Sequence, residues 1–141
     1  MKYFEATADI HSHSDKIWKL LTDAEAFPTW NPTVDRVEGT ISSGQTIKVF
    51  VKVNPGRAFP VKVTQFEAGR RMVWSGGMPL GLFKGERTYD LTPVSEGLVR
   101  FKMREEYSGP MLSMIWSTIP DLGPSFDEFA RSLKKAAEKE S

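Results

Sequence analysis

The chain has 141 residues, of which 40% are hydrophobic and 26% charged, and it carries 19 Lys and Arg residues, 18 Asp and Glu residues and no cysteine. The lack of cysteine excludes disulfide scaffolds, cysteine-ligated metals and thiol nucleophiles, and a net charge of +1 provides no positive electrostatic field to attract nucleic acid. No apolar run reaches the ~20 residues that span a bilayer, and the N-terminus lacks the apolar stretch of a signal peptide. We therefore expect one cytoplasmic domain over residues 1–141 with no metal, no cofactor, no nucleic-acid partner and no stable membrane insertion, while the oligomeric state stays open.

The first part of the chain predicts a strand followed by two short helices. Polar and apolar residues alternate over Lys2–Ile10, as in a strand with one buried face. A helix-start signal and helical apolar spacing follow over Ser14–Leu21. The segment Ala24–Pro32 holds two prolines in five positions, so any helix there is brief and ends by Trp30 or Asn31.

From Val34 to Tyr107 the apolar period changes to two residues and stays there. Turn sequences separate the alternating runs, among them Asn54-Pro55-Gly56 and Ser95-Glu96-Gly97. This spacing predicts about six antiparallel strands in a meander, with one polar and one apolar face.

The helical period returns after Gly109-Pro110. Prolines at 120 and 124 predict a break within this C-terminal helical region. The segment Ser125–Glu128 fits the capping-box pattern, so we expect the long helix to begin there and to end near Lys139.

This order of elements predicts an α+β fold in which a curved antiparallel sheet of about seven strands wraps around a long C-terminal helix, because the apolar face of the sheet needs a cover and only that helix is long and amphipathic. Six Met, nine Phe and four Trp residues provide large, adaptable side chains for the space between sheet and helix. They either line an apolar cavity or simply fill a core.

Two segments carry a recognisable pair of motifs, WKLLTD at residues 18–23 and FPTWNP at residues 27–32. The similarity continues through FKGERTY at 83–89, EEYSG at 105–109 and PDLGPSF at 120–126 to LKKA at 133–136. These motifs resemble the START-like superfamily called SRPBCC, which includes polyketide cyclases/dehydrases, lipid-transfer proteins and the birch-pollen-allergen type. The resemblance implies a helix-grip fold with an internal cavity, and it does not name the ligand.

Arg87 and Glu105 stand at positions that the alternation assigns to the apolar face. A short turn centred on residues 95–97 sets Arg87 opposite Glu105, and likewise Tyr89 opposite Met103 and Leu91 opposite Phe101. Because an unpaired buried charge is too costly, the two groups should bond each other or a ligand. Three interpretations stay open: a structural ion pair at the cavity rim, a slip of register that exposes both groups, and a substrate-orienting pair.

The expected cavity of several hundred Å³ defines the candidate binding residues. They are Asn31, Val49, Val51, Val63, Trp74, Phe83, Arg87, Tyr89, Phe101, Met103, Glu105, Ile115, Trp116, Phe126 and Phe129. For Asn31 two roles are open, an amide that bonds ligand at the entrance and a cap of the turn before Pro32. The glycine-rich segment Gly76–Gly81 is interpreted as a mobile hairpin tip over the pocket mouth. The only histidines, His11 and His13, are interpreted as a solvated strand end rather than a metal site.

Three functions remain at this point. The first is binding of a small hydrophobic or amphipathic ligand, such as a lipid, a polyketide-like aromatic or an isoprenoid. The second is a cyclase or dehydrase in which Arg87, Glu105 and Tyr89 act on a carbonyl; the absence of an interior histidine disfavours it. The third is a protein-interaction module such as a chaperone cofactor, whose mark would be an exposed apolar patch that the sequence does not locate.

Overall fold

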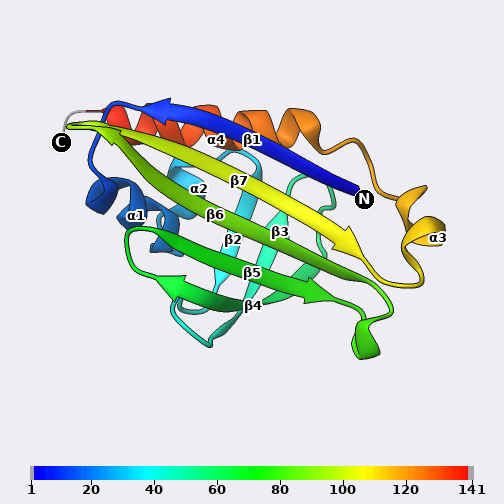
Figure 1. Ribbon diagram of the computed structural model, residues 1–141. Coiled ribbons are helices and arrows are strands. Elements are labelled where there is room, and N and C mark those ends of the chain that lie inside the picture. The colour runs from blue at the N-terminus through cyan, green and yellow to red at the C-terminus, as the bar shows by residue number, and fades with distance from the viewer. Residues whose placement is uncertain (1, 140–141) are drawn as a thin grey trace.

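Seven antiparallel strands form one curved sheet in the order β1-β7-β6-β5-β4-β3-β2 (Figure 1). The computed structural model describes residues 2–139. The strands are β1 (Lys2–Ile10), β2 (Val34–Glu38), β3 (Thr46–Val51), β4 (Ala58–Glu67), β5 (Arg71–Gly77), β6 (Lys84–Ser95) and β7 (Leu98–Ser108). The α-helices are α1 (Ser14–Thr22), α2 (Phe27–Trp30), α3 (Leu112–Trp116) and α4 (Gly123–Glu138), and η1 (Pro79–Gly81) is a single 3-10 turn. This arrangement confirms the predicted helix-grip fold with two short helices after the first strand.

The two-residue alternation decides which side chains enter the core. On β7, Val99, Phe101 and Met103 are buried, whereas the intervening Arg100 and Lys102 are exposed. The β6–β7 register sets Arg87 opposite Glu105, Tyr89 opposite Met103 and Leu91 opposite Phe101, as the short turn predicts. A shift of one residue would turn all of these side chains to the other face.

Helix α4 covers the concave face and runs alongside β1 (Figure 1). Its buried side chains recur at helical spacing, so that one stripe faces the sheet; they are Phe126, Phe129, Ala130, Leu133 and Ala137. The helix ends at Glu138 with Lys139 as its C-cap, so the expected end near Lys139 is confirmed.

The start of α4 differs from the prediction. The helix begins at Gly123, and Ser125 lies inside its first turn with no capping hydrogen bond. Asp121 Oδ1 accepts the Gly123 N–H at 2.9 Å. Pro124 follows within the first turn, where its fixed φ favours a helix and its missing N–H costs nothing. A proline at this position therefore started the helix two residues earlier than the capping box indicated, while the predicted break before it is confirmed by the separate helix α3.

Side chains of α4 bind the open edge of β1. Lys134 Nζ donates to the Asp9 carbonyl oxygen at 2.6 Å, and Glu138 Oε2 accepts the His11 N–H at 2.8 Å. Lys134 and Glu138 also bond each other at 2.7 Å. Backbone groups that an edge strand leaves unpaired are therefore bonded by α4.

This contact predicts a pH dependence. The Lys134 ammonium and the His11 N–H lower the pKa of Glu138 below its ordinary value of 4.5. A carboxyl with a lowered pKa in the folded protein stabilises above its unfolded pKa, and the contribution is lost as pH falls through the folded pKa. Wild type should therefore be more stable than Glu138→Gln at pH 7, and urea unfolding over a descending pH series should show this difference shrinking as Glu138 takes up its proton below its ordinary pKa of 4.5. A difference that does not change between pH 7 and the acid end of the series would contradict the assignment to the charged carboxylate.

Candidate ligand-binding site

An ion pair lies on the concave face between β6 and β7. Arg87 Nε donates to Glu105 Oε1 at 2.8 Å, and the two side chains keep only 20% and 19% of their exposure. The guanidinium carbon lies 4.7 Å from the centre of the Phe126 ring on α4. Both charges therefore face the helix, and the alternative in which a register slip exposes them is excluded.

The charge of Arg87 is stabilised by its neighbours. Burial disfavours the charge of Arg87, but the carboxylate of Glu105 and the nearby Tyr89 hydroxyl outweigh it, so the pKa of Arg87 lies above its ordinary value. Burial raises the pKa of Tyr89 to about 12. Burial, together with the charge of Glu105, also raises the pKa of Tyr107. Near neutral pH both phenols keep their protons and are available as hydrogen-bond donors.

Unpartnered polar atoms surround this ion pair. Trp74 Nε1, Tyr89 OH and Tyr107 OH are buried, and within residues 2–139 none makes a hydrogen bond of normal geometry. The two phenols are nevertheless close enough to interact with the pair, Tyr89 with Arg87 and Tyr107 with Glu105. Trp74 lies opposite Arg87 in the β5–β6 register, and its ring centre is 4.9 Å from that of Tyr89. A buried donor left unpaired costs about 1–3 kcal/mol, so native proteins rarely tolerate several in one place.

Tyr107 was missed as a member of this group. The alternation that selects Glu105 also puts Tyr107, two residues further on, on the concave face. Its ring stacks on Phe83 at 6.1 Å and packs against Trp116 at 5.5 Å. Tyr107 therefore lies between Trp116 of α3 and Glu105 of the ion pair.

Aromatic rings fill the centre of the concave face. The Phe129 ring of α4 lies within 5.5–6.1 Å of rings on α2, β6 and β7, namely those of Phe27, Trp30, Tyr89 and Phe101. Other predicted binding residues are buried in the same core, namely Val49, Val63, Trp74, Met103 and Phe126. Val51 packs at the edge of this core, and Phe83, Ile115 and Trp116 are partly buried.

Asn31 combines features of its two predicted roles. Its Oδ1 accepts the Thr33 N–H at 3.0 Å and the Thr33 hydroxyl at 2.7 Å, which is the turn-capping role. Its Nδ2 is buried and unpartnered. The residue is only 1% exposed, so it does not lie at a solvent-facing entrance.

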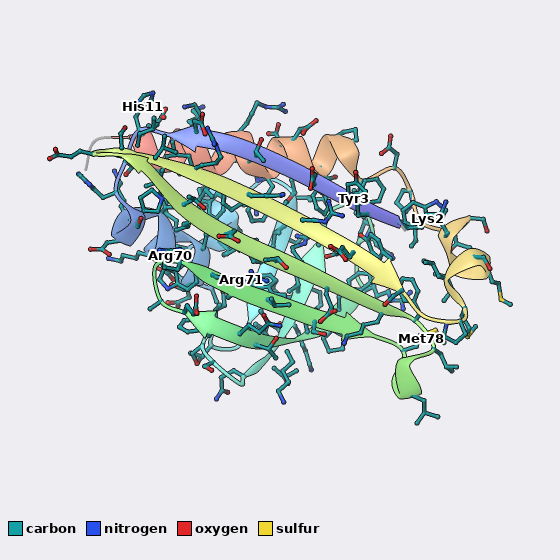
Figure 2. All side chains as sticks on the ribbon, in the orientation of Figure 1. Lys2, Tyr3, His11, Arg70, Arg71 and Met78 are labelled. Carbon is teal, nitrogen blue, oxygen red and sulfur yellow. The ribbon has the colours of Figure 1, made fainter. Side chains whose placement is uncertain are left out.

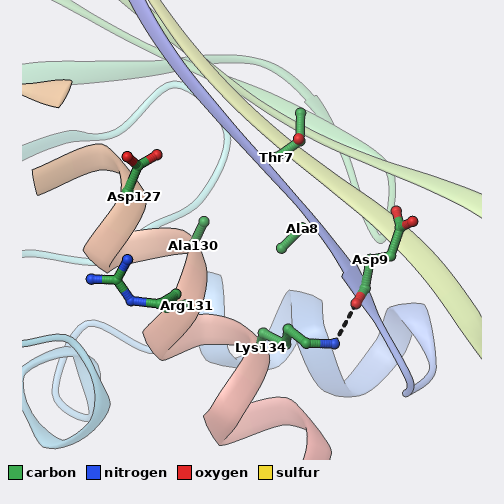
Figure 3. Close-up of a pocket in the computed structure, with 7 residues that line it drawn as sticks. All are labelled: Thr7, Ala8, Asp9, Asp127, Ala130, Arg131 and Lys134. Carbon is green, nitrogen blue, oxygen red and sulfur yellow. Dashed lines mark hydrogen bonds between the residues drawn. The ribbon is translucent and has the colours of Figure 1, made fainter. Parts of the chain in front are cut away.

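Two open hollows lie away from these residues. One, of about 480 Å³, lies between β1 and α4 (Figure 3), and its lining is Thr7, Ala8, Asp9, Asp127, Ala130, Arg131 and Lys134. The other, of about 530 Å³, lies between the end of α1 and residues 39–41. Neither is lined by a predicted binding residue, and the internal cavity stays a prediction. In the described part of the chain, no three His, Cys, Asp or Glu residues are grouped to hold a metal ion.

The glycine-rich segment forms the β5–β6 hairpin end, where Met78 lies (Figure 2). Gly77 is required there because a Cβ would come within 2.2 Å of the Phe83 carbonyl oxygen. The Met111 N–H donates to the Leu82 carbonyl oxygen at 2.9 Å, so the hairpin end is bonded to the segment before α3.

Two large apolar side chains near this end of the molecule are exposed to solvent. The Leu80 side chain is 96% exposed and that of Met114 is 68% exposed, and the sequence did not locate either of them.

Residues 1–138 match the family model described as polyketide cyclase / dehydrase and lipid transport. The chain belongs to this family. No curated protein gives a match. Within the described residues, no helix of this family member is long and apolar enough to cross a membrane.

Solved structures similar to this family member share its fold at low sequence identity. A hypothetical protein from Helicobacter pylori superposes with a TM-score of 0.77 at 13% identity, covering 96% of this chain and 88% of that chain. The Zhui aromatase/cyclase from Streptomyces sp. R1128 superposes with a TM-score of 0.73 at 12% identity, covering 97% of this chain and 93% of that chain. A START superfamily protein from Mycobacterium smegmatis superposes with a TM-score of 0.69 at 16% identity, covering 96% of this chain and 97% of that chain. At these identities the likeness shows the fold and not the activity.

Proposed function

We propose that the protein binds a small hydrophobic or amphipathic ligand, such as a lipid, a polyketide-like aromatic or an isoprenoid, between the concave face of the sheet and α4, in the cytoplasm. The supporting observation is that the Trp74 N–H and the Tyr89 O–H, beside the Arg87–Glu105 pair, are buried without an acceptor in otherwise apolar surroundings. Binding pockets combine apolar walls with a few polar groups that fix the ligand's orientation. A ligand that accepts hydrogen bonds from these donors would remove the cost of leaving them unpaired.

The aromatic rings would provide the affinity and the ion pair the orientation. Removing apolar surface from water contributes roughly 25 cal/mol per Å². Glu105 engages Arg87 at Nε, so the terminal nitrogens of the guanidinium can present further N–H donors to a ligand.

A glycine on β6 leaves room beside the ion pair. Gly85 is opposite Tyr107 and two residues from Arg87, on the concave face. A Cβ at this position would meet the Tyr107 ring at 3.6 Å and Glu105 Oε2 at 3.8 Å, which are ordinary van der Waals contacts. One methyl group therefore fits, whereas a longer side chain would extend over the groups that we propose to contact ligand.

This space can be tested with a matched pair of variants. Gly85→Leu should weaken binding of the neutral fluorescent probe N-phenylnaphthylamine by about tenfold, because its side chain occupies ligand space. Gly85→Ala should bind within about twofold of wild type. The measurement is a fluorescence titration of each variant beside a thermal melt. Wild-type affinity in a folded Gly85→Leu protein would show that the ligand lies elsewhere.

A cyclase or dehydrase activity is the second candidate, and the closeness of Arg87, Glu105 and Tyr89 favours it. General acid–base catalysis works best with a group whose pKa lies near the operating pH. The pKa of Tyr89 is raised to about 12 by burial, and Glu105 is held by Arg87. These properties suit polarisation of a bound group better than proton transfer, which is why binding is the first proposal.

Native mass spectrometry of the purified full chain distinguishes the two candidates. A binding protein should carry a small molecule that is released on denaturation and stays chemically unchanged during long incubation with fresh protein. Conversion of that molecule by wild type but not by Arg87→Met would establish the enzyme instead. A protein at its apo mass that also takes up no N-phenylnaphthylamine would contradict the binding proposal.

A further inference from the structure

We infer that the polar end of the ligand is an uncharged hydrogen-bond acceptor, a ketone or ester carbonyl oxygen, and that the Trp74 indole N–H and the Tyr89 hydroxyl receive it together. This inference rests on the proposed binding function and goes beyond it by naming the chemical class of the recognised group.

The charge balance disfavours an anionic ligand. Arg87 is the cation of the concave group, and Glu105 already compensates it at 2.8 Å. A carboxylate or phosphate placed beside the pair would add a second negative charge in a mostly buried region, where the positive charge of Arg87 is already paired with Glu105. Burying a charge without a partner is among the most expensive changes in a protein interior.

The unpartnered groups are donors rather than acceptors. An indole N–H can only donate, and Trp74 is 4% exposed with Nε1 unbonded. Tyr89 is fully buried, and the polar side chain that acts on its hydroxyl most strongly is Arg87, which offers only N–H groups. The oxygen of Tyr89 therefore faces a donor, and its own O–H lacks an acceptor.

The charged acceptor nearest in effect to Tyr89 is Glu105, whose Oε1 is already bonded to Arg87 Nε at 2.8 Å. The ring neighbours of Trp74 and Tyr89 are aromatic side chains, namely Phe27, Phe101 and Phe129. The Tyr107 hydroxyl differs, because Glu105 acts on it as a nearby acceptor. Trp30 Nε1 and Asn31 Nδ2 are also buried and unpartnered, but Trp74 and Tyr89 are the two such donors that adjoin Arg87, through the β5–β6 register and the Tyr89 hydroxyl.

A carbonyl oxygen suits this pair chemically. It has two lone pairs and no proton, so it can accept from both donors at once. A ligand hydroxyl would bring a further donor into a group already rich in donors. A hydrocarbon would leave both donors unpaired at about 1–3 kcal/mol each.

Three naphthalenes of matched shape test the inference with the full-length protein: acetylnaphthalene, ethylnaphthalene and naphthoate. Acetylnaphthalene should bind about tenfold more tightly than ethylnaphthalene, and naphthoate should bind more weakly than acetylnaphthalene. Calorimetric titration measures all three. Tyr89→Phe and Trp74→Phe keep a ring in place and should each reduce the preference for acetyl over ethyl by at least about threefold, while the affinity for ethylnaphthalene stays close to wild type.

Control variants remove the same groups elsewhere. Tyr3→Phe deletes an exposed phenol on the opposite face of the sheet, and Trp18→Phe deletes an indole that packs against Phe66. Both should keep the wild-type preference. Equal binding of all three compounds, or tightest binding of naphthoate, would overturn the carbonyl inference and leave the binding function standing. Binding of none of the three would contradict the binding function itself and the inference with it.

Discussion

Replacing Phe129 by Ala should destabilise the protein more than any other single substitution on the concave face. Its ring on α4 contacts rings on α2, β6 and β7, including a parallel contact with Phe101 at 6.1 Å. Truncating a fully buried Phe removes transfer free energy and leaves a cavity, which together cost about 3–5 kcal/mol. We expect the melting temperature to fall by roughly 10 °C, measured by circular dichroism.

Phe50→Ala is the matched control for this truncation. Phe50 is partly buried on the opposite face of β3, under the Arg36 guanidinium at 3.7 Å. Losing this side chain should cost about 1 kcal/mol. Similar losses in urea unfolding for the two variants would contradict a central role of Phe129 in joining the helix to the sheet.

The second large effect concerns the ion pair. Glu105→Leu should cost about 3 kcal/mol, because it leaves the mostly buried guanidinium of Arg87 without its counter-charge. Arg87→Met should cost less, since a stranded carboxyl can take up a proton and a guanidinium cannot lose one. The double variant should recover much of the stability that Glu105→Leu loses, because apolar side chains of similar volume can replace a buried pair. Urea unfolding of the three variants measures this, and a double variant no more stable than Glu105→Leu would contradict it.

The same substitution separates a binding role of Arg87 from a structural one. In the proposed function Arg87 orients the polar end of the ligand, so Arg87→Met should weaken binding of acetylnaphthalene and spare that of ethylnaphthalene. In a structural role the substitution lowers the melting temperature and leaves both affinities unchanged. Calorimetry beside a thermal melt distinguishes these results, and the second would remove Arg87 from the proposed site.

Much of the fold was predictable because its signals are local. The two-residue alternation and the short turn at residues 95–97 together determine the β6–β7 register, which sets Arg87 opposite Glu105. The start of α4 was predicted wrongly because two local signals competed, and the proline at 124 prevailed over the capping pattern at Ser125.

The candidate site was harder to predict because its members depend on long-range packing. Whether the Trp74 N–H finds an acceptor depends on residues from β6 and α2 that no local pattern brings together. The hydrogen bonds of Lys134 and Glu138 with the edge of β1 span more than a hundred residues of sequence and carry no local signal. The motifs of the family specify the fold that contains these contacts, and not the contacts themselves.

The indole resonances of the four tryptophans test most directly whether ligand binds at the concave face. A proton–nitrogen correlation spectrum, recorded during titration with acetylnaphthalene and assigned with Trp74→Phe and Trp18→Phe, follows each indole N–H separately. We predict that the Trp74 resonance shifts and saturates with one equivalent of ligand, whereas that of Trp18, packed against Phe66, stays in place. A Trp74 resonance that does not move, with shifts confined to the hollow around Thr7 and Lys134 or with no shifts at all, would contradict the account.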